Sequence, residues 1–127
     1  MSKEAIRTES APGAIGPYSQ AIVSGGVLYC SGQIGLDPAS GDLVAGGFEA
    51  EARQVLANLD AVARGAGMTL ADAVKLTVYV TSLADFPKLN EIFVSVLAEP
   101  YPARATVEVS ALPKGALVEV DMVASRG

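Results

Sequence analysis

Tyr101-Pro102-Ala103-Arg104-Ala105-Thr106-Val107-Glu108-Val109 is a strand-like run that begins with an arginine. The prolines in and just before it favour an extended approach, because a proline disfavours the helical conformation of the residue that precedes it. From Ala105 onward apolar and polar residues alternate, which is typical of a strand. Arg104 shares the parity of Thr106, so both side chains are expected on one face. Such an arginine is either a solvated strand end or a planar fork that can hold a carboxylate.

The rest of the chain divides into helix-like and strand-like segments around this run. Residues 48–66 carry apolar side chains at helical spacing, and the glycines at 65 and 67 provide a stop. A second helix is expected after Asp85, which suits an N-cap, with Pro87 in its first turn. Strands are expected at residues 5–8, 21–23, 27–30, 74–81, 104–110 and 117–124.

The order of these segments, β-β-β-α-β-α-β-β, indicates an α+β fold. We expect a mixed β-sheet with two helices packed on one face, in a single domain spanning residues 1–127. The pair Gly25-Gly26 separates two strand-like runs and predicts a β-hairpin. On one face of the fourth strand, alternation predicts an apolar set: Val74, Leu76, Val78 and Val80. The second helix has a predicted apolar stripe of Phe86, Leu89, Phe93, Val94 and Leu97.

The composition indicates an oligomer. Of the 127 residues, 50% are hydrophobic, and the mean hydropathy is +0.38. A small chain leaves much of its surface exposed, so this excess of apolar residues points to an interface with a partner chain. The net charge is −5 and no basic cluster is present, so nucleic acid is not an expected partner. No apolar run has the length of a membrane span, and the first residues lack the apolar core of a signal peptide.

A single cysteine, Cys30, and the absence of histidine limit the chemistry. An internal disulfide is impossible, the usual zinc sites are excluded, and a reduced cytoplasmic setting fits. Acid–base catalysis then depends on a carboxylate, lysine, tyrosine, the cysteine or water. Cys30 lies in a strand-like run and is expected to act as a small hydrophobe. No phosphate-binding glycine loop stands between a strand and a helix, so a reaction without a cofactor is expected.

Four stretches, in order, resemble signatures of the RidA (YjgF) family of enamine/imine deaminases. They are Gly-Pro-Tyr-Ser-Gln-Ala at 16–21, Ser-Gly-Gln-Ile at 31–34, Pro-Ala-Arg-Ala-Thr-Val-Glu-Val at 102–109, and Leu-Pro-Lys-Gly-Ala-Leu-Val-Glu-Val at 112–120. Together they extend over the whole chain. The resemblance implies a chorismate-mutase-like fold, assembled as a homotrimer with active sites in the clefts between subunits.

The resemblance also implies an activity and its site residues. The reaction is hydrolysis of reactive 2-enamino and 2-imino acids, such as 2-iminobutanoate and 2-iminopropanoate, to 2-keto acids and ammonia. Arg104 matches the arginine that binds the substrate carboxylate, Glu119 the glutamate that positions water, and Tyr18 a tyrosine of the pocket wall. Further matches to substrate-binding positions are Ser31, Gly32, Asn90 and Thr106. Asp121 has no role in the match, and from the pattern alone Glu119 and Asp121 form the wet face of a strand.

Other interpretations stay open beside this one. Many relatives have a cysteine where this chain has Thr106, although chains with threonine there also resemble the family, so no thiol nucleophile is required. Asn90 is equally well explained as an amide on a helix surface, and Tyr18 as a packing residue. The alternatives for the whole chain are a deaminase of another type, such as one acting on 2-aminomuconate, a non-enzymatic sensor that binds small carboxylates through Arg104, and a ribonuclease or translation inhibitor. The acidic charge and the lack of histidine weigh against the last.

Overall fold

The predicted strands form one mixed sheet in the computed structural model, which describes residues 2–126. The strands are β1 (Glu4–Ile6), β2 (Ala21–Ser24), β3 (Val27–Ile34), β4 (Ala73–Val80), β5 (Ala103–Glu108) and β6 (Val118–Ser125). Their order across the sheet is β1-β2-β3-β6-β4-β5. β4 and β5 are parallel, and the other neighbouring pairs are antiparallel. The last strand of the chain, β6, therefore lies in the middle of the sheet.

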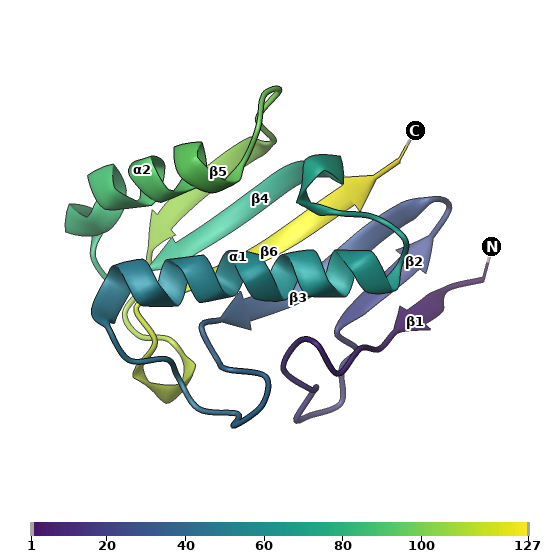
Figure 1. The fold of residues 1–127 in the computed structure, drawn as a ribbon, viewed down its shortest axis with the longest axis horizontal. Coiled ribbons are helices and arrows are strands. Elements are labelled where there is room, and N and C mark those ends of the chain that lie inside the picture. The colour runs from purple at the N-terminus through teal and green to yellow at the C-terminus, as the bar shows by residue number, and fades with distance from the viewer. Residues whose placement is uncertain (1, 127) are drawn as a thin grey trace.

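Helices α1 (Gly47–Gly65) and α2 (Phe86–Val96) both lie on one face of this sheet (Figure 1). The apolar stripe of α1 is buried, as its spacing predicts. It packs on the alternate residues of the central strands that point toward the helices, among them Leu28, Leu76, Val78, Val120 and Met122. The α+β prediction, with two helices on one face of a mixed sheet, is confirmed.

The predicted β-hairpin is present, and a short capped helix precedes β4. The hairpin between β2 and β3 turns at Gly25 and Gly26, whose φ angles of 62° and 78° are readily adopted by glycine. Thr69 and Asp72 form a reciprocal capping box at the start of a short 3-10 helix that precedes β4.

Three details of the predicted pattern are wrong. Val74 is 48% exposed instead of buried, because a register shift between β4 and β6 at this point places Ala73 in the core. In α2, Val94 is 64% exposed, and Ile92 is buried in its place on the stripe. Asp85 precedes α2 at the N-cap position but forms no side-chain capping bond, since a 3-10 helix capped by Ser82 leads into α2 there.

The opposite face of the sheet is not covered by a helix of the described chain. β5 presents Ala105 and Val107 on this open face, and β3 presents Tyr29, which is 51% exposed. Glu119 and Asp121 on β6 point the same way, since their neighbours Val118, Val120 and Met122 are buried. Among residues 2–126, no helix has the length and apolar character needed to cross a bilayer.

Candidate active site

Arg104 lies on the helix side of the sheet because of the register between β4 and β5. Its Cα is paired with Leu76, a buried core residue, and residues paired across neighbouring strands point to the same face. The guanidinium lies over two rings of α2, with Cζ 5.2 Å from the centroid of Phe86 and 5.5 Å from that of Phe93. Both distances suit a cation–π interaction. Within residues 2–126 no carboxylate forms an ion pair with Arg104.

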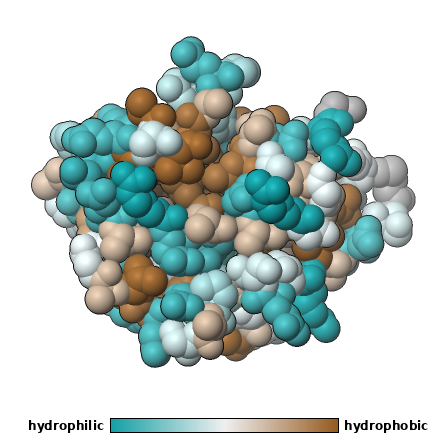
Figure 2. All heavy atoms as spheres, viewed as in Figure 1, coloured by the Kyte–Doolittle hydropathy of each residue, from teal (hydrophilic) through white to brown (hydrophobic). Residues whose placement is uncertain are grey.

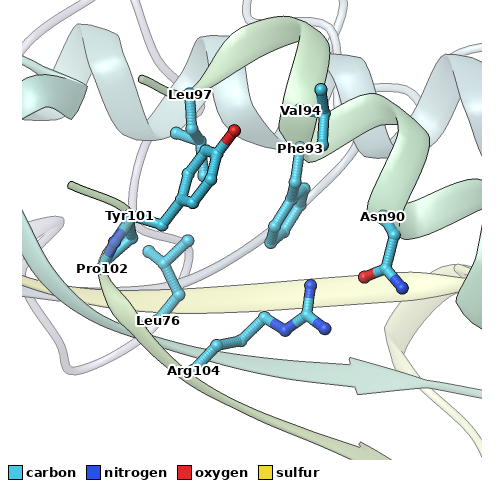
Figure 3. A pocket seen from close by; sticks show the side chains of 8 residues that line it. All are labelled: Leu76, Asn90, Phe93, Val94, Leu97, Tyr101, Pro102 and Arg104. Atoms are coloured by element: carbon cyan, nitrogen blue, oxygen red, sulfur yellow. The ribbon is translucent and has the colours of Figure 1, made fainter. Parts of the chain in front are cut away.

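A cavity of about 280 Å³ opens beside this guanidinium. Figure 2 shows hydrophobic side chains gathered where α2 lies beside β4 and β5. In Figure 3 the Arg104 side chain points toward Phe93 and Asn90, while Tyr101 and Leu97 lie at the other end of the cavity. A cation and an amide at one end of an apolar hollow can hold a small carboxylate whose remaining part is apolar.

Thr106 follows Arg104 on the same face of β5, where it is paired with Val78. Its Oγ1 is buried and has no hydrogen-bond partner among the described residues. A buried hydroxyl without a partner is costly, and such groups are rare in folded proteins. Arg104, Asn90 and Thr106 therefore form one group of predicted site residues, which we call the arginine group.

The other predicted residues gather around the loop that precedes β2. Tyr18 is 51% exposed and lies after a tight turn, in which its N–H donates to the Gly16 carbonyl over 2.8 Å. The Ser31 hydroxyl donates to the Ser19 carbonyl over 2.6 Å and so attaches this loop to β3. Tyr18 and Gly32 line a common cavity of about 230 Å³.

Gly32 and Glu119 are in direct contact. Gly32 lies where the β3–β6 register shifts between Cys30 and Gln33. A Cβ placed on Gly32 would collide with the Glu119 carboxyl group, at only 2.9 Å from its Cδ. The glycine therefore leaves the space that the carboxyl group occupies, as expected where another group closely approaches a strand. Tyr18, Ser31, Gly32 and Glu119 form a second group, which we call the glutamate group.

Glu119 has an environment that favours its neutral form. Burial raises the pKa of its carboxyl, and the nearby Asp121 carboxylate raises it further. The Tyr79 hydroxyl donates a hydrogen bond to Asp121 Oδ2 over 2.9 Å. That hydrogen bond is the main reason why the pKa of Tyr79 is raised, with smaller contributions from burial and from the two carboxylates.

The two groups do not meet within one chain. Arg104 faces the helices and Glu119 the open side of the sheet. Their strands are separated by β4, so they lie two strand spacings, about 10 Å, apart even before the opposite directions of the side chains are counted. One chain thus carries two separate half-sites.

The sequence patterns gave no role to Tyr79 or to the aromatic rings under Arg104. Tyr79 and Asp121 lie 42 residues apart, and only the β4–β6 register brings them together. Cys30 is buried as expected, and burial, with a smaller effect of Asp121, raises its pKa to about 12. In residues 2–126 no group of three or more Cys, Asp or Glu side chains is arranged to hold a metal ion.

Comparison with known proteins finds a matching family model, similar sequences and similar solved structures. The family model described as endoribonuclease L-PSP matches residues 8–126. The human 2-iminobutanoate/2-iminopropanoate deaminase is 46% identical over 127 residues, which are 100% of this chain and 93% of the human protein. A RutC family protein of Pyrococcus horikoshii is 48% identical over 122 residues, 96% of this chain and 97% of that protein. The crystal structure of RidA from an Antarctic Psychrobacter has a TM-score of 0.94 and 49% identity, covering 97% of this chain and 99% of that one.

Proposed function

The chain belongs to the endoribonuclease L-PSP (RidA/YjgF) family, and from this membership we propose that it is a deaminase hydrolysing 2-imino acids, in equilibrium with 2-enamino acids, to 2-keto acids and ammonia. Several mammalian relatives, among them the human protein, are named 2-iminobutanoate/2-iminopropanoate deaminase. In the chain itself, the observation that carries the proposal is the Arg104 guanidinium, which has no carboxylate partner in residues 2–126 and faces an apolar cavity.

The complete site forms between two copies of the chain, in a homotrimer. Arginine and glutamate groups lie on opposite faces of the sheet, so a site that contains both needs a second chain. The open face is rich in apolar side chains, and covering it with another copy would bury them. A closed ring of copies repeats the same contact, and every contact joins the arginine group of one copy to the glutamate group of the next.

Arg104 binds the substrate in this mechanism. Its planar fork donates two parallel hydrogen bonds to the carboxylate oxygens of the substrate, while the rings of Phe86 and Phe93 hold the guanidinium in place. Hydrogen bonds to charged groups contribute roughly 1.5–3 kcal/mol each. Asn90 lines the same cavity and offers a further polar contact, and Thr106 lies next to Arg104 on the same face of β5. The apolar wall takes the short side chain of the imino acid.

Glu119 acts as the general base for the attacking water. The water oxygen forms a bond to the imine carbon, the C=N electron pair moves to nitrogen, and a water proton passes to the Glu119 carboxylate. Glu119 then gives this proton to the amine nitrogen and accepts the proton of the hydroxyl group, so the C–N bond breaks, ammonia leaves and the hydroxyl oxygen becomes the keto oxygen. A positioned general base contributes on the order of 10²–10⁴ in rate. Tyr18 and the Gly32 backbone limit the access of bulk water. Neither step uses a cofactor.

The imine carbon is electrophilic in its protonated form, so no covalent intermediate with the protein is required. Cys30 has no part in the reaction, because its thiol is buried and its pKa is raised to about 12. We also propose a cytoplasmic location, on the ground that the single cysteine can form no internal disulfide.

A coupled assay tests the activity. A PLP-dependent dehydratase releases imines from serine or threonine, and a keto-acid reductase reports each keto acid through oxidation of NADH. We expect keto acid to appear faster with the protein than by spontaneous hydrolysis, and Arg104→Lys protein to add nothing to that background. A rate no higher than the background, for imines of several side chains, would show that the protein is not an imine deaminase. Binding of keto acids without turnover would indicate a sensor, and cleavage of RNA a ribonuclease.

A further inference from the structure

The open face of the sheet carries a carboxylate beside Glu119 that the proposed mechanism does not use. Asp121 lies two residues along β6 on the same face. On β4, Tyr79 is paired with Glu119 and Thr77 with Asp121. The Tyr79 side chain nevertheless extends diagonally to Asp121, since its hydroxyl donates to Asp121 Oδ2 over 2.9 Å. The Tyr79 backbone is therefore paired with Glu119 while its hydroxyl holds Asp121, which fixes the Asp121 carboxylate next to Glu119.

We infer that Asp121, held by Tyr79, is a positioning residue that makes Glu119 a stronger proton acceptor for the attacking water. The inference rests on the proposed function and adds a residue to its mechanism. A fixed negative charge close to Glu119 disfavours a second charge there, and the effect is larger on a partly buried face than in water. General-base catalysis gains as the pKa of the base rises toward the working pH.

The electrostatics of the site agree with this geometry. Burial raises the pKa of Glu119 first, and the charge of Asp121 raises it further. Tyr79 occupies an oxygen of Asp121, whereas no side chain among the described residues donates a hydrogen bond to Glu119. Glu119 is thus the carboxylate left to hold a water molecule. Asp121 remains attached to β4 and acts on the reaction only through its charge.

Other titratable groups around Glu119 do not supply the same effect. They are Tyr29, Cys30 and Lys75 on the neighbouring strands, Tyr18 on the loop, and Lys114, which lines the same cavity as Tyr18 and Gly32. Lys75 is paired with Val123, on the side of Asp121 away from Glu119, and Lys114 donates a hydrogen bond to the Gly41 carbonyl over 3.3 Å. The charged residues of β5, Arg104 and Glu108, share the helix side with their partners Leu76 and Val80. Asp121 is therefore the carboxylate closest to Glu119 on this face.

The test removes the charge of Asp121 without changing its shape. The Glu119 titration is followed by carboxyl-carbon NMR in the whole protein, with the signal assigned through Glu119→Gln. In Asp121→Asn the midpoint of Glu119 should move to lower pH, and Asp121→Glu should restore it. Glu4→Gln is the matched control, because it removes one negative charge from an exposed position of β1, which is separated from β6 by β2 and β3, and should leave the midpoint unchanged.

Turnover provides the second readout. In Asp121→Asn the acid limb of kcat/KM against pH should move to lower pH together with the NMR midpoint, and the plateau should fall several-fold because the base is weaker. A purely structural role for Asp121 would lower activity without moving the limb. The Tyr79 hydroxyl reports on the pair by its ultraviolet absorbance, and its pKa should fall toward the ordinary value in Asp121→Asn.

The outcomes separate this inference from the proposed function. If the wild-type protein hydrolyses imines and the Glu119 midpoint is the same in Asp121→Asn, the inference is wrong and the function stands. If no imine is hydrolysed, the proposed function fails, and the catalytic role of Asp121 fails with it, whatever the NMR midpoint shows. Asp121→Ser removes the same charge with a smaller side chain and replaces the asparagine variant in both measurements if that variant does not fold.

Discussion

At the scale of single residues, each half-site depends on one residue that no other residue type could replace. Arg104 combines a fork for a carboxylate with a flat face for the rings of Phe86 and Phe93. Gly32 leaves the space that the Glu119 carboxyl group fills. Arg104 is needed because it can bind a carboxylate, and Gly32 because it has no side chain.

Arg104→Lys is expected to abolish nearly all imine hydrolysis while the fold and the assembly are retained. Lysine keeps the charge but loses both the fork and the planar stacking surface, so the substrate carboxylate is no longer oriented. The coupled assay measures the loss, and circular dichroism with sedimentation checks the fold and assembly. Arg53→Lys on the exposed face of α1 is the matched control and should retain full activity. Activity of Arg104→Lys close to wild type would mean that another group holds the carboxylate.

Glu119→Gln is expected to lower kcat by roughly 10²-fold or more, the scale of a lost general base. The amide keeps the shape of the side chain, so binding of keto acids should survive. A change in kcat with little change in ligand affinity is the pattern of an interaction made mainly in the transition state. Isothermal titration with a keto acid gives the dissociation constant, and the coupled assay gives kcat. If Glu119→Gln no longer binds keto acids but hydrolyses bound imine at the normal rate, Glu119 holds the ligand and does not activate water.

The same variant should be more stable than the wild type at neutral pH. The pKa of Glu119 is raised in the folded state, so the folded protein binds more protons than the unfolded chain near this pKa. Stability is therefore lost as pH rises from the ordinary carboxyl range through the raised pKa. Glu119→Gln removes this loss, and its advantage in urea unfolding should disappear as pH falls below that range. The measurements need one fixed protein concentration if the protein assembles.

Gly32→Ala should inactivate the protein by displacing the Glu119 carboxyl group. The added Cβ meets that group, and the side chain can swing away at little cost to the fold. We expect kcat to fall while the unfolding midpoint changes little. Gly13→Ala is the matched control, because nothing lies within 4 Å of a Cβ placed there. Unchanged kcat in Gly32→Ala would show that the position of the carboxyl group is not critical.

At the scale of elements, one buried amide connects the two ends of the loop that carries Tyr18. Gln20 accepts a hydrogen bond from Thr8 N–H over 2.7 Å and donates to the carbonyls of Thr8 and Pro12 over 3.0 and 2.8 Å. These bonds attach residues 8–12 to the start of β2. The position of Tyr18 is thus determined by an element with no regular secondary structure.

Gln20→Leu should destabilise the protein by about 1–3 kcal/mol, the cost of buried polar groups left without partners. The loop should loosen before the sheet does. Hydrogen exchange at the Thr8 amide is the specific readout, because that amide is bound to the Gln20 side chain. Exchange at Thr8 should accelerate, whereas exchange in β6, the central strand, should follow global unfolding alone. Slow exchange at Thr8 in Gln20→Leu would show that the loop is held by other contacts.

Alternation and helical spacing were sufficient to predict the element order, because these patterns are local. The failures also have local causes. The register shift near Val74 turned one residue of an alternating strand outward, and nothing in the residue types signals such a shift. Ile92 and Val94 are two residues apart and point to nearly opposite sides of α2, and the packing of the helix on the sheet buries Ile92 and leaves Val94 exposed. The pairing of Tyr79 with Asp121 required the register of β4 against β6, which no pattern contains.

At the scale of the whole molecule, the site is divided between two faces of one sheet. Because side chains alternate along a strand, the sequence predicts that Arg104 and Thr106 lie on one face of β5. The same alternation predicts that Glu119 points away from the buried face of β6. Neither strand alone reveals that the two directions are opposite. That fact follows from the pairing of Arg104 with Leu76 and of Glu119 with Tyr79. Assembly is therefore a requirement of the proposed chemistry, and it can be tested separately from the chemistry.

Sedimentation equilibrium at micromolar concentration should give three times the chain mass of 12.9 kDa. Val107→Asp places a charge on the open face, where Val107 is 43% exposed, and should dissociate the trimer and abolish hydrolysis together. Ala57→Asp, at an exposed position of α1 outside the Arg104 cavity, is the control for added charge and should leave the assembly intact. A wild-type monomer with full activity would exclude a site shared between copies.

Mixing two inactive variants decides whether the halves come from different copies. Arg104→Lys chains keep the glutamate group, and Glu119→Gln chains keep the arginine group. If each site joins an arginine group to the glutamate group of the next copy, random reassembly of equal amounts restores about one quarter of the sites, because each half must be intact by independent chance. If each site lies within one chain, reassembly restores nothing. Restored turnover after joint refolding, and none after mixing without subunit exchange, would locate the reaction at the contact between copies.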